Sequence, residues 1–535
     1  MKVRSTSWDG MSLLMSVLML SMNLPLKRVS CFSLVHSVSK RTTLHNHNIK
    51  SVLHQSTRST SSSSSSSSSS TAADVSVTIA PPPVLTTSDS PVILLKHSRQ
   101  SKAFRNGNQL VFQGSIQKGN ATVGTLVEVA VENKIKKHKD KDKQDSNNNN
   151  NIKPLSIGWG VFNPNSLYRV RILCHRYLQP KLYQSIIDQK DDWTAEETLA
   201  MILRHQFQAA LKKRQALSLT NNHAITSMYR LVNGEGDSLS GLQVDVINQD
   251  HIVIQSSAAW CEIHKEIILE TFQQVMPCPN LIWKVAESRL KQDGYPSPPQ
   301  QTQPDDNDHH EPVLALENGV TFQTFPTELG QKTGVYCDQR ENRHTLAQYT
   351  HGKTVLDLCC YHGGFSLTAI LQGGATKAVG VDSSAAAIDI AMENARINQC
   401  ADKVSFQQAD ITEFMQQQQQ QQYYDVVVLD PPKLAPTAKG LDRASRKYHA
   451  LNRDAIKLVN PTDGGLLMTC TCSAAMTQQD GGQYFLEMVA RAAMSAGRQV
   501  TLMSKHGAAS CHTQSPISSP AGAYLTAALF FVHPL

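Results

Sequence analysis

Four aspartates in the second half of the chain each close a short run that predicts a strand, and their carboxylates are hydrogen-bond acceptors. Because parallel strands of an open α/β sheet end at one edge, where such sheets bind ligands, we expect the four side chains to surround one crevice. Asp382, the second of them along the chain, has the position of an acceptor for ribose hydroxyls. Asp410, the third, is suited to accept a hydrogen bond from an adenine amino group. This arrangement is typical of a site for an adenosine-containing cofactor. In chain order the four are Asp357, Asp382, Asp410 and Asp430.

A loop with two glycines follows the first run. The segment Val355-Leu-Asp-Leu-Cys-Cys-Tyr-His-Gly-Gly-Phe-Ser366 predicts a strand, a tight turn and a helix. Glycine takes backbone angles that are costly for other residues, so the chain can approach a ligand closely here. The predicted cofactor-binding residues of the loop are Cys359, Tyr361, Gly363 and Gly364, with Ser383 after the second run.

The fourth run, Asp425–Asp430, continues into Pro431 and Pro432. The prolines fix the backbone, so this turn presents a carboxylate and a carbonyl rigidly. Four strand–helix steps that end in acids predict an α/β sheet that binds S-adenosylmethionine. The alternative is an NAD-binding sheet or another doubly wound fold. An Asp-Pro-Pro turn after a fourth strand has no role in dehydrogenases, which favours a methyltransferase.

Two thiols follow a further apolar run, in Thr469-Cys-Thr-Cys-Ser473. A thiolate that adds to cytosine C6 makes C5 reactive enough to take a methyl group, so a cysteine here can act as a nucleophile. The alternative is that Cys470 and Cys472 are small buried hydrophobic residues, as free cysteines usually are. Both share one face of a strand, and Cys472 lies nearer the carboxyl end, where ligands bind. This position favours Cys472.

Four blocks of the sequence resemble one family, the bacterial large-subunit rRNA cytosine-5 methyltransferases of the RlmI type. The resemblance covers roughly residues 91–535, and its blocks are Tyr229–Asp245, Gly330–Arg343, Asp430–Lys433 and Thr469–Ser473. It implies a class I (Rossmann-like) methyltransferase domain, preceded by a small PUA RNA-binding β-barrel and a middle α/β domain. The predicted domains are residues 1–74 (targeting peptide and Ser-rich linker), 91–175 (PUA-like), 190–320 (middle) and 321–535 (methyltransferase).

The resemblance also implies roles for single residues. The family's nucleophile is the central cysteine of a Ser-Cys-Ser-like motif, which Thr471-Cys472-Ser473 matches. Asp430 is the second predicted catalytic residue: it, or the Pro431 carbonyl, would hold the edge of the cytosine. Lys433 stands, as in this family, where many cytosine-5 enzymes have a second cysteine. Cys470 occupies a position that is usually apolar, so the assignment of a single cysteine stays open.

The resemblance also suggests a role for two polar blocks that precede Val355. They are Gln331–Gly334 and Asp338–Arg340. They predict residues that fold over the methionine end of the cofactor or over the incoming base. The alternative is the start of a polar helix in which Asp338, Glu341 and Arg343 are merely solvated. The predicted cofactor-binding residues of the two blocks are Lys332, Thr333, Gly334, Gln339 and Arg340.

The positive charge is unevenly distributed. The net charge is +7, and residues 1–73 hold eight Lys/Arg and one Asp, so the remainder of the chain is neutral. Residues 75–175 carry fourteen Lys/Arg against six Asp/Glu, while residues 176–535 are net acidic. The excess on the PUA-like part fits an RNA anchor on phosphates, although the Lys134–Lys143 run reads as a solvated loop. The predicted RNA-binding residues are Lys96, Arg99 and Lys433.

The first seventy or so residues have the composition of an organellar presequence. They are rich in Ser, Thr, His and basic residues and end in the ten-serine run Ser61–Ser70. The apolar stretch Met11–Leu24 is too short to span a bilayer comfortably, so we expect a soluble mature protein in a plastid or mitochondrion. The eleven cysteines lack metal-ligand spacing, so we expect reduced thiols and no metal.

Patterns of alternation and periodicity predict the remaining elements. Short strands with Gly/Asn turns over Pro91–Cys174 suggest a small barrel, Thr194–Leu217 predicts a helix, and Tyr524–Val532 predicts a last, antiparallel strand. Asn233–Asp237 reads as a structural turn between a helix and a hairpin. Further predicted strands are Gln109–Phe112, Gly124–Val129, Tyr168–Leu173, Val244–Gln255 and Asn280–Val285; predicted surface loops are Asp140–Asn151, Asp293–Glu311 and Gln416–Gln422.

Three functions remain open from the sequence. The first is a cytosine-5 methyltransferase that acts on organellar large-subunit rRNA and forms a covalent intermediate through Cys472. The second is a base-N methyltransferase of the guanine-N7 type, which needs no nucleophile. The third is a non-catalytic RNA-binding assembly protein. Cys472 favours the first over the second, and the set of acids disfavours the third. The partner prediction is RNA, with a homodimer left open.

Overall fold

A computed structural model describes residues 87–96, 99–132, 154–296, 311–326, 336–418, 422–435, 438–515, 517 and 522–535. The predicted presequence, the Lys134–Lys143 run and the predicted loop at 140–151 lie outside these ranges. No helix within them is long and apolar enough to cross a membrane.

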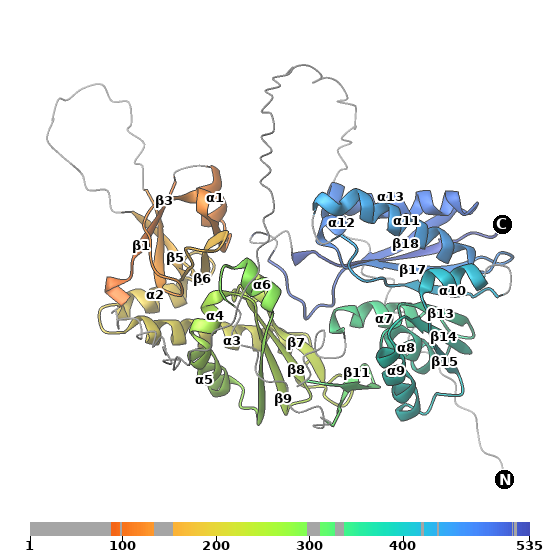
Figure 1. Cartoon of the computed structure of the whole chain (residues 1–535). Helices are drawn as coiled ribbons and strands as arrows, with labels where there is room; N and C mark the ends of the chain where they lie inside the picture. Colours follow the sequence, from red (N-terminus) through yellow and green to blue (C-terminus); the bar gives the residue numbers. More distant parts are fainter. Residues whose placement is uncertain are drawn as a thin grey trace, which may run out of the picture. The chain divides into compact units, whose positions relative to one another are not determined.

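The carboxyl-terminal part is a seven-stranded sheet in the order β15-β14-β13-β16-β17-β19-β18 (Figure 1). All neighbouring pairs from β15 to β17 are parallel, and β19 pairs antiparallel with both of its neighbours. This confirms the predicted α/β class and the antiparallel last strand. The strands are β13 (Thr354–Leu358), β14 (Lys377–Asp382), β15 (Val404–Gln408), β16 (Val426–Leu429), β17 (Gly465–Thr471), β18 (Val500–His506) and β19 (Thr526–Val532).

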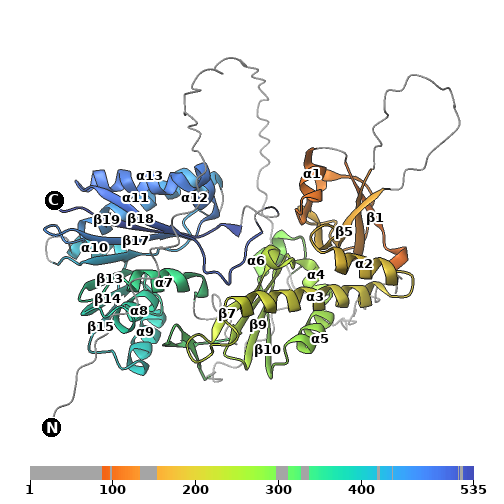
Figure 2. The same cartoon turned by 180° about the vertical axis from the view of Figure 1, so that it is seen from behind.

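Helices cover both faces of this sheet, as the two opposite views show (Figures 1 and 2). The central strand β16 is buried along its whole length, which explains why it is an uninterrupted apolar run. The strand order reverses between β13 and β16, and sheets of this type bind ligands outside the carboxyl ends of the strands at that point. One face carries α7 (Arg340–Ala347), α8 (Gly364–Leu371) and α9 (Ala385–Ile397); the other carries α10 (Ile411–Gln418), α11 (Leu441–Lys457) and α13 (Gln483–Ser495), and α12 (Ala474–Gln478) follows β17.

The amino-terminal part is a six-stranded sheet in the order β2-β6-β5-β4-β1-β3. It is curled rather than closed, since β2 and β3 are its two ends, so the predicted barrel is incomplete. Glycines allow tight contact in β5: a Cβ at Gly158 would lie 2.1 Å from the Cys174 carbonyl oxygen. The elements are β1 (Val92–Leu95), α1 (Arg99–Arg105), β2 (Leu110–Phe112), β3 (Ile116–Lys118), β4 (Leu126–Val131), β5 (Leu155–Phe162) and β6 (Tyr168–His175).

The middle part is a four-stranded sheet in the order β10-β9-β8-β7, with helices packed on it. The helix predicted from Thr194 is α3 (Ala195–Ala216), and Thr194 caps it by accepting a hydrogen bond from the Glu197 N–H. The single strand predicted over Val244–Gln255 is instead a hairpin that turns at Asn248. The elements are α2 (Pro180–Gln189), α3, β7 (Met228–Asn233), β8 (Leu242–Ile247), β9 (His251–Ser256), α4 (Ala259–Ile263), α5 (Lys265–Val275), β10 (Asn280–Val285), α6 (Glu287–Gln292), β11 (Val313–Glu317) and β12 (Val320–Thr324).

The amino-terminal and middle sheets share one hydrophobic core, which contains Trp159 and Leu173 from the first and Val244 from the second. Asp293, predicted to begin a surface loop, is buried beside this core, so that prediction is wrong at its first residue. Its carboxylate accepts hydrogen bonds from Arg171 Nη2 at 2.7 Å and from the Ala259 N–H at 2.8 Å. A carboxylate with these partners is satisfied without solvent, which explains its burial.

The turn at Asn233–Asp237 is structural, as expected, but it connects β7 to β8 rather than a helix to a hairpin. Asp237 is buried and accepts hydrogen bonds from Arg214 at 2.7 and 2.9 Å and from Thr513 Oγ1 at 2.7 Å. A Cβ at Gly236 would lie 2.1 Å from the Thr513 carbonyl oxygen, so only glycine fits. The turn thus holds the segment that precedes β19.

Candidate active site

The four aspartates stand at the carboxyl ends of four neighbouring parallel strands, β15, β14, β13 and β16, and the thiol of Cys359 comes directly after β13. Burial raises the pKa of this thiol most, and the negative charges of Asp382, Asp430, Asp357 and Asp410 each raise it further. The predicted convergence of the four acids on one edge of the sheet is therefore what the structure contains. Cys359 itself is a neutral thiol in this setting, so it suits packing against a ligand better than nucleophilic attack.

Asp357 lies fully buried between β13 and α8. Its Oδ2 accepts hydrogen bonds from the Ser366 N–H at 3.0 Å and from Ser366 Oγ at 2.8 Å. Its Oδ1 is buried and has no hydrogen-bond partner among the described residues. Burial raises the pKa of Asp357 to about 6. An acceptor left open at this point fits a ligand that brings its own donor.

Asp382, at the end of β14, is half-buried and oriented by backbone groups. Its two oxygens accept hydrogen bonds from the N–H groups of Tyr361 and Ser384, each at 3.0 Å. Tyr361 has a φ of 50° and Cys359 a φ of 64°, so the loop between β13 and α8 turns sharply toward Asp382. Ser383, the next predicted residue, is exposed.

The glycines of this loop are required by their surroundings. Gly363 has a φ of 81°, and a Cβ there would lie 2.7 Å from the ring of Phe406. A Cβ at Gly364 would lie 2.9 Å from Arg343 Nη1. The loop therefore packs closely against β15 on one side and α7 on the other, and it cannot carry larger residues at these positions.

Asp410 has a role that the sequence did not indicate. Its Oδ1 accepts hydrogen bonds from the N–H groups of Thr412 at 2.7 Å and Glu413 at 3.2 Å, so it caps α10. The Glu413 N–H is the largest cause that lowers its pKa. The carboxylate is exposed, and its proposed contact with adenine stays a prediction.

Asp338 and Arg343 are buried, so the alternative of a solvated helix start is wrong for these two residues, whereas Glu341 is partly exposed. Gln339 donates from Nε2 to Asp430 Oδ2 at 2.9 Å, which connects this block to the end of β16. Asp338 accepts a hydrogen bond from the Tyr524 hydroxyl at 2.7 Å, and Arg343 pairs with Glu317 at 2.7 Å. Arg340 is also buried, but it pairs with Glu341 at 3.0 Å. The predicted residues Lys332, Thr333 and Gly334 lie outside the described residues.

The two thiols of β17 differ in their surroundings. Cys470 is fully buried in the strand, opposite Ala527 of β19. Cys472 lies just beyond the strand and is half-buried. It directly follows Thr471, whose Oγ1 donates a hydrogen bond to the Tyr448 hydroxyl at 2.9 Å, so it lies close to the Tyr448 side chain. Of the two cysteines, Cys472 has the position of a nucleophile and Cys470 that of a core residue.

Asp430 directly follows β16, the strand that pairs with β17. Burial and then the charge of Asp338 raise its pKa to about 7, so both protonation states are populated at neutral pH. Neighbouring hydrogen bonds hold the end of β17 in place: Thr471 Oγ1 donates to the Tyr448 hydroxyl at 2.9 Å, and Ser473 Oγ donates to the Ala435 carbonyl at 2.6 Å. The edge of the sheet therefore carries a thiol, a titrating carboxyl and aromatic rings together.

Comparisons with known proteins identify the family to which the chain belongs. A family model described as S-adenosylmethionine-dependent methyltransferase matches residues 299–504. The ribosomal RNA large subunit methyltransferase I of Aliivibrio fischeri (strain ATCC 700601 / ES114) is 31% identical over 443 residues, which cover 80% of this chain and 96% of that relative. The protein of the same name from Tolumonas auensis is 33% identical over 304 residues, which cover 55% of this chain and 71% of the relative. The chain belongs to this family.

Solved structures agree on the fold of this family member. A methyltransferase complexed with SAH superposes with a TM-score of 0.61 at 19% identity, covering 82% of this chain and 99% of that one. A SAM-dependent methyltransferase from Streptococcus mutans gives a TM-score of 0.59 at 18% identity, with the same coverage. The cofactor of the chain is S-adenosylmethionine, and the NAD alternative is excluded. The open acceptor of Asp357, the half-buried Asp382 and the close-packed glycine loop fit this cofactor.

Two aromatic residues of the methyltransferase site were missed from the sequence. Tyr336 lies edge-on to Tyr361, with ring centroids 5.0 Å apart, and Tyr361 stacks on His362 at 3.7 Å. Tyr448 is fully buried on α11. Tyr336 lies within Gly330–Arg343, one of the blocks that resemble the family, so the sequence alone could have indicated it as a site residue. Nothing in the helical pattern around Tyr448 separates it from an ordinary core residue.

The three predicted RNA-binding residues lie in different parts of the chain. Lys96 is exposed and donates from Nζ to the Gly114 carbonyl at 2.9 Å. Lys433 is exposed directly after Pro432, next to the end of β16. Arg99 begins α1, and its side chain lies outside what the structure describes.

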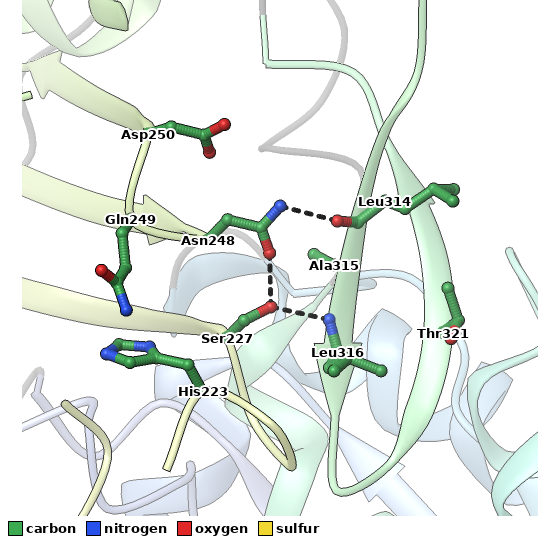
Figure 3. A pocket seen from close by; sticks show the side chains of 9 residues that line it. All are labelled: His223, Ser227, Asn248, Gln249, Asp250, Leu314, Ala315, Leu316 and Thr321. Carbon is green, nitrogen blue, oxygen red and sulfur yellow. Dashed lines mark hydrogen bonds between the residues drawn. The ribbon is translucent and has the colours of Figure 1, made fainter. Parts of the chain in front are cut away.

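A hollow of about 600 Å³ lies away from the strand ends that form the methyltransferase site (Figure 3). Its polar groups bond to one another: Ser227 Oγ donates to Asn248 Oδ1 at 2.6 Å, and Asn248 Nδ2 donates to the Leu314 carbonyl at 2.7 Å. None of the four strand-end acids lines it. We assign it no part in the reaction.

Proposed function

We propose that this protein transfers a methyl group from S-adenosylmethionine to C5 of a cytosine in large-subunit rRNA. The observation that carries the proposal is the position of Cys472, which is half-buried at the end of β17, directly after the Thr471 that bonds to Tyr448. Family membership supports rRNA as the substrate, because the relatives are named for it. A base-N methyltransferase would need no thiol at this place.

In the proposed reaction, the Cys472 sulfur forms a bond to C6, and the electron pair of the C5–C6 double bond moves to C5. S-adenosylmethionine, when bound, would supply the methyl group: the bond from that methyl to the sulfonium would break as C5 bonds to it, and S-adenosylhomocysteine would be the leaving group. A base then removes the C5 proton, the C5–C6 double bond forms again, and the Cys472 sulfur leaves. Cys470 takes no part, because it is fully buried.

Asp430 would hold the edge of the cytosine. Cytosine presents an acceptor at N3 next to a donor at its amino group, and a carboxyl that is protonated donates to the first and accepts from the second. With a pKa raised to about 7, Asp430 can supply that protonated form at neutral pH. Gln339, which donates to Asp430 at 2.9 Å, fixes its orientation.

The base must leave any helix to reach Cys472, so the expected substrate is a loop or partly opened rRNA. We propose that the curled amino-terminal sheet is the PUA-like RNA anchor, on the charge excess of residues 75–175. We also propose that residues 1–74 direct the protein to an organelle, on their Ser-rich, acid-poor composition. A homodimer stays a prediction.

The test is covalent trapping. RNA that carries 5-fluorocytosine at the target nucleotide should form a stable adduct with the wild-type protein, because fluorine cannot leave as a proton does. Cys470→Ser should form the same adduct, and Cys472→Ser should form none. Mass-spectrometric mapping of rRNA nucleosides in a knockout identifies the target beforehand. Full activity of Cys472→Ser without any adduct would instead favour methylation of a purine nitrogen.

A further inference from the structure

One segment of the methyltransferase sheet is strongly basic, although residues 176–535 as a whole are net acidic. Between residues 433 and 447 there are five cations and one acid, Asp442. The segment runs from the turn after Asp430 into the first two turns of α11. All five cationic side chains are exposed. They are Lys433, Lys439, Arg443, Arg446 and Lys447.

Helix α11 has a buried face that packs on the sheet and an exposed face that carries cations. Ala444, Tyr448 and Leu451 are buried against the sheet, and Tyr448 reaches the end of β17 through its hydrogen bond with Thr471. The cations occupy the outer face, where residues three or four apart are neighbours about 5–6 Å apart between their Cβ atoms. The helix that supports the reactive edge on one side therefore presents a row of positive charges on the other.

A hollow of about 380 Å³ continues this row between α11 and α13. Two of its three arginines have acidic partners: Arg453 pairs with Asp454 at 2.8 Å, and Arg491 pairs with Glu487 at 3.6 Å. Arg446 is exposed at its rim and forms no ion pair with any residue that the structure describes. The hollow is lined by Ser445, Arg446, His449, Ala450, Arg453, Met488 and Arg491.

The row begins at the active site. Lys433 directly follows the Asp430-Pro-Pro turn. Lys447 lies on α11, which packs against α10, and α10 is the helix that Asp410 caps. A polyanion bound along α11 would thus pass the edge at which the base reacts.

We propose that the outer face of α11, with the hollow against α13, binds the phosphate backbone of the RNA strand that carries the target base. The inference rests on the proposed function. It makes α11 a second RNA-binding surface, in addition to the one proposed on the amino-terminal sheet. Guanidinium groups suit phosphate because they donate two parallel hydrogen bonds. Such contacts fix the register of the strand without reading its sequence.

The test compares binding of Arg446→Glu and the double variant Arg443→Ala/Arg446→Ala with that of the wild-type full chain. The matched control is Arg396→Ala, an exposed arginine of α9 on the opposite face of the sheet. The probes are a large-subunit rRNA transcript and an unrelated single-stranded oligoribonucleotide, titrated at several salt concentrations. We expect both α11 variants to lose roughly 5- to 10-fold in affinity at low salt, with a shallower salt dependence. Affinity for S-adenosylmethionine and the control variant should be unchanged.

Equal affinity and an equal salt dependence in the α11 variants would overturn the proposal. Unchanged binding of naked RNA together with lost methylation of ribosomal particles would also overturn it, and would assign this face to a protein partner. Because binding is measured without turnover, absence of rRNA methylation by the wild type would contradict the proposed function alone.

Discussion

The two halves of the reactive edge are built differently. In the half formed by β13, β14 and β15, backbone N–H groups orient every carboxylate, as those of Tyr361 and Ser384 orient Asp382. In the half formed by β16 and β17, side chains from distant segments do this work: Gln339 orients Asp430 across 91 residues of sequence. Backbone groups survive substitution and side chains do not. We have proposed that the first half (the cofactor half) binds the cofactor and the second half (the base half) holds the base. On that proposal, mutations in the first half should weaken cofactor binding, and mutations in the second half should lower turnover.

The largest expected effect lies in the base half. Cys472→Ser should lower turnover by about 1,000-fold or more, because a hydroxyl is a much poorer nucleophile than a thiolate. Its affinity for S-adenosylmethionine should stay at the wild-type value. Single-turnover kinetics and calorimetry measure the two quantities. The matched variant Cys470→Ser should lose far less turnover, and equal losses in both variants would break the distinction between the two thiols.

In the cofactor half, Asp382→Ala should weaken S-adenosylmethionine by roughly 1.5–3 kcal/mol, the contribution of hydrogen bonds to a charged group. Calorimetric titration gives the value directly. Turnover at saturating cofactor should fall much less, because the contact predicted for Asp382 is with the ribose of the cofactor. Unchanged affinity for S-adenosylmethionine together with a large loss of turnover would contradict the assignment of Asp382 to the cofactor.

Tyr336 tests the border between the halves, since its ring packs edge-on against that of Tyr361 and it stands three residues before Gln339, which bonds to Asp430. We expect Tyr336→Ala to raise KM for RNA by the equivalent of about 1–3 kcal/mol, the range for stacking between a base and an aromatic ring. Tyr336→Phe keeps the ring and should behave like the wild type. A loss in Tyr336→Phe as large as that in Tyr336→Ala would assign the effect to the hydroxyl.

The smallest expected effect is on stability. Burial raises the pKa of Asp430 to about 7, so the folded protein binds a proton that the unfolded chain has released above about pH 4. This group therefore contributes stability that is present below pH 4 and is lost as the pH rises through 7. Asp430→Asn removes that contribution, so its melting temperature should fall less between pH 5 and pH 8 than that of the wild type. Identical pH profiles would show that Asp430 is solvated.

The sequence predicted the parallel sheet better than the rest of the molecule. Strands such as β16 are buried on both faces and therefore appear as uninterrupted apolar runs. In the amino-terminal sheet β5 was missed, because Gly158 and Gly160 interrupt its pattern for the sake of close contact with β6. In the site, the end of each strand was predictable from its acid. The contact of Gln339 with Asp430 was not, because spacing along the chain does not reveal side chains that meet only after folding.

The burial of Arg171 against Asp293 has a consequence for synthesis of the chain. The two residues are 122 positions apart, and the amino-terminal sheet is complete at His175. At about 5–20 residues per second, the ribosome makes Asp293 roughly 6–24 s after Arg171. Throughout that interval the emerging sheet carries an uncompensated guanidinium at a surface that is later buried. The sheet can therefore reach its final packing only after the middle of the polypeptide has left the ribosome.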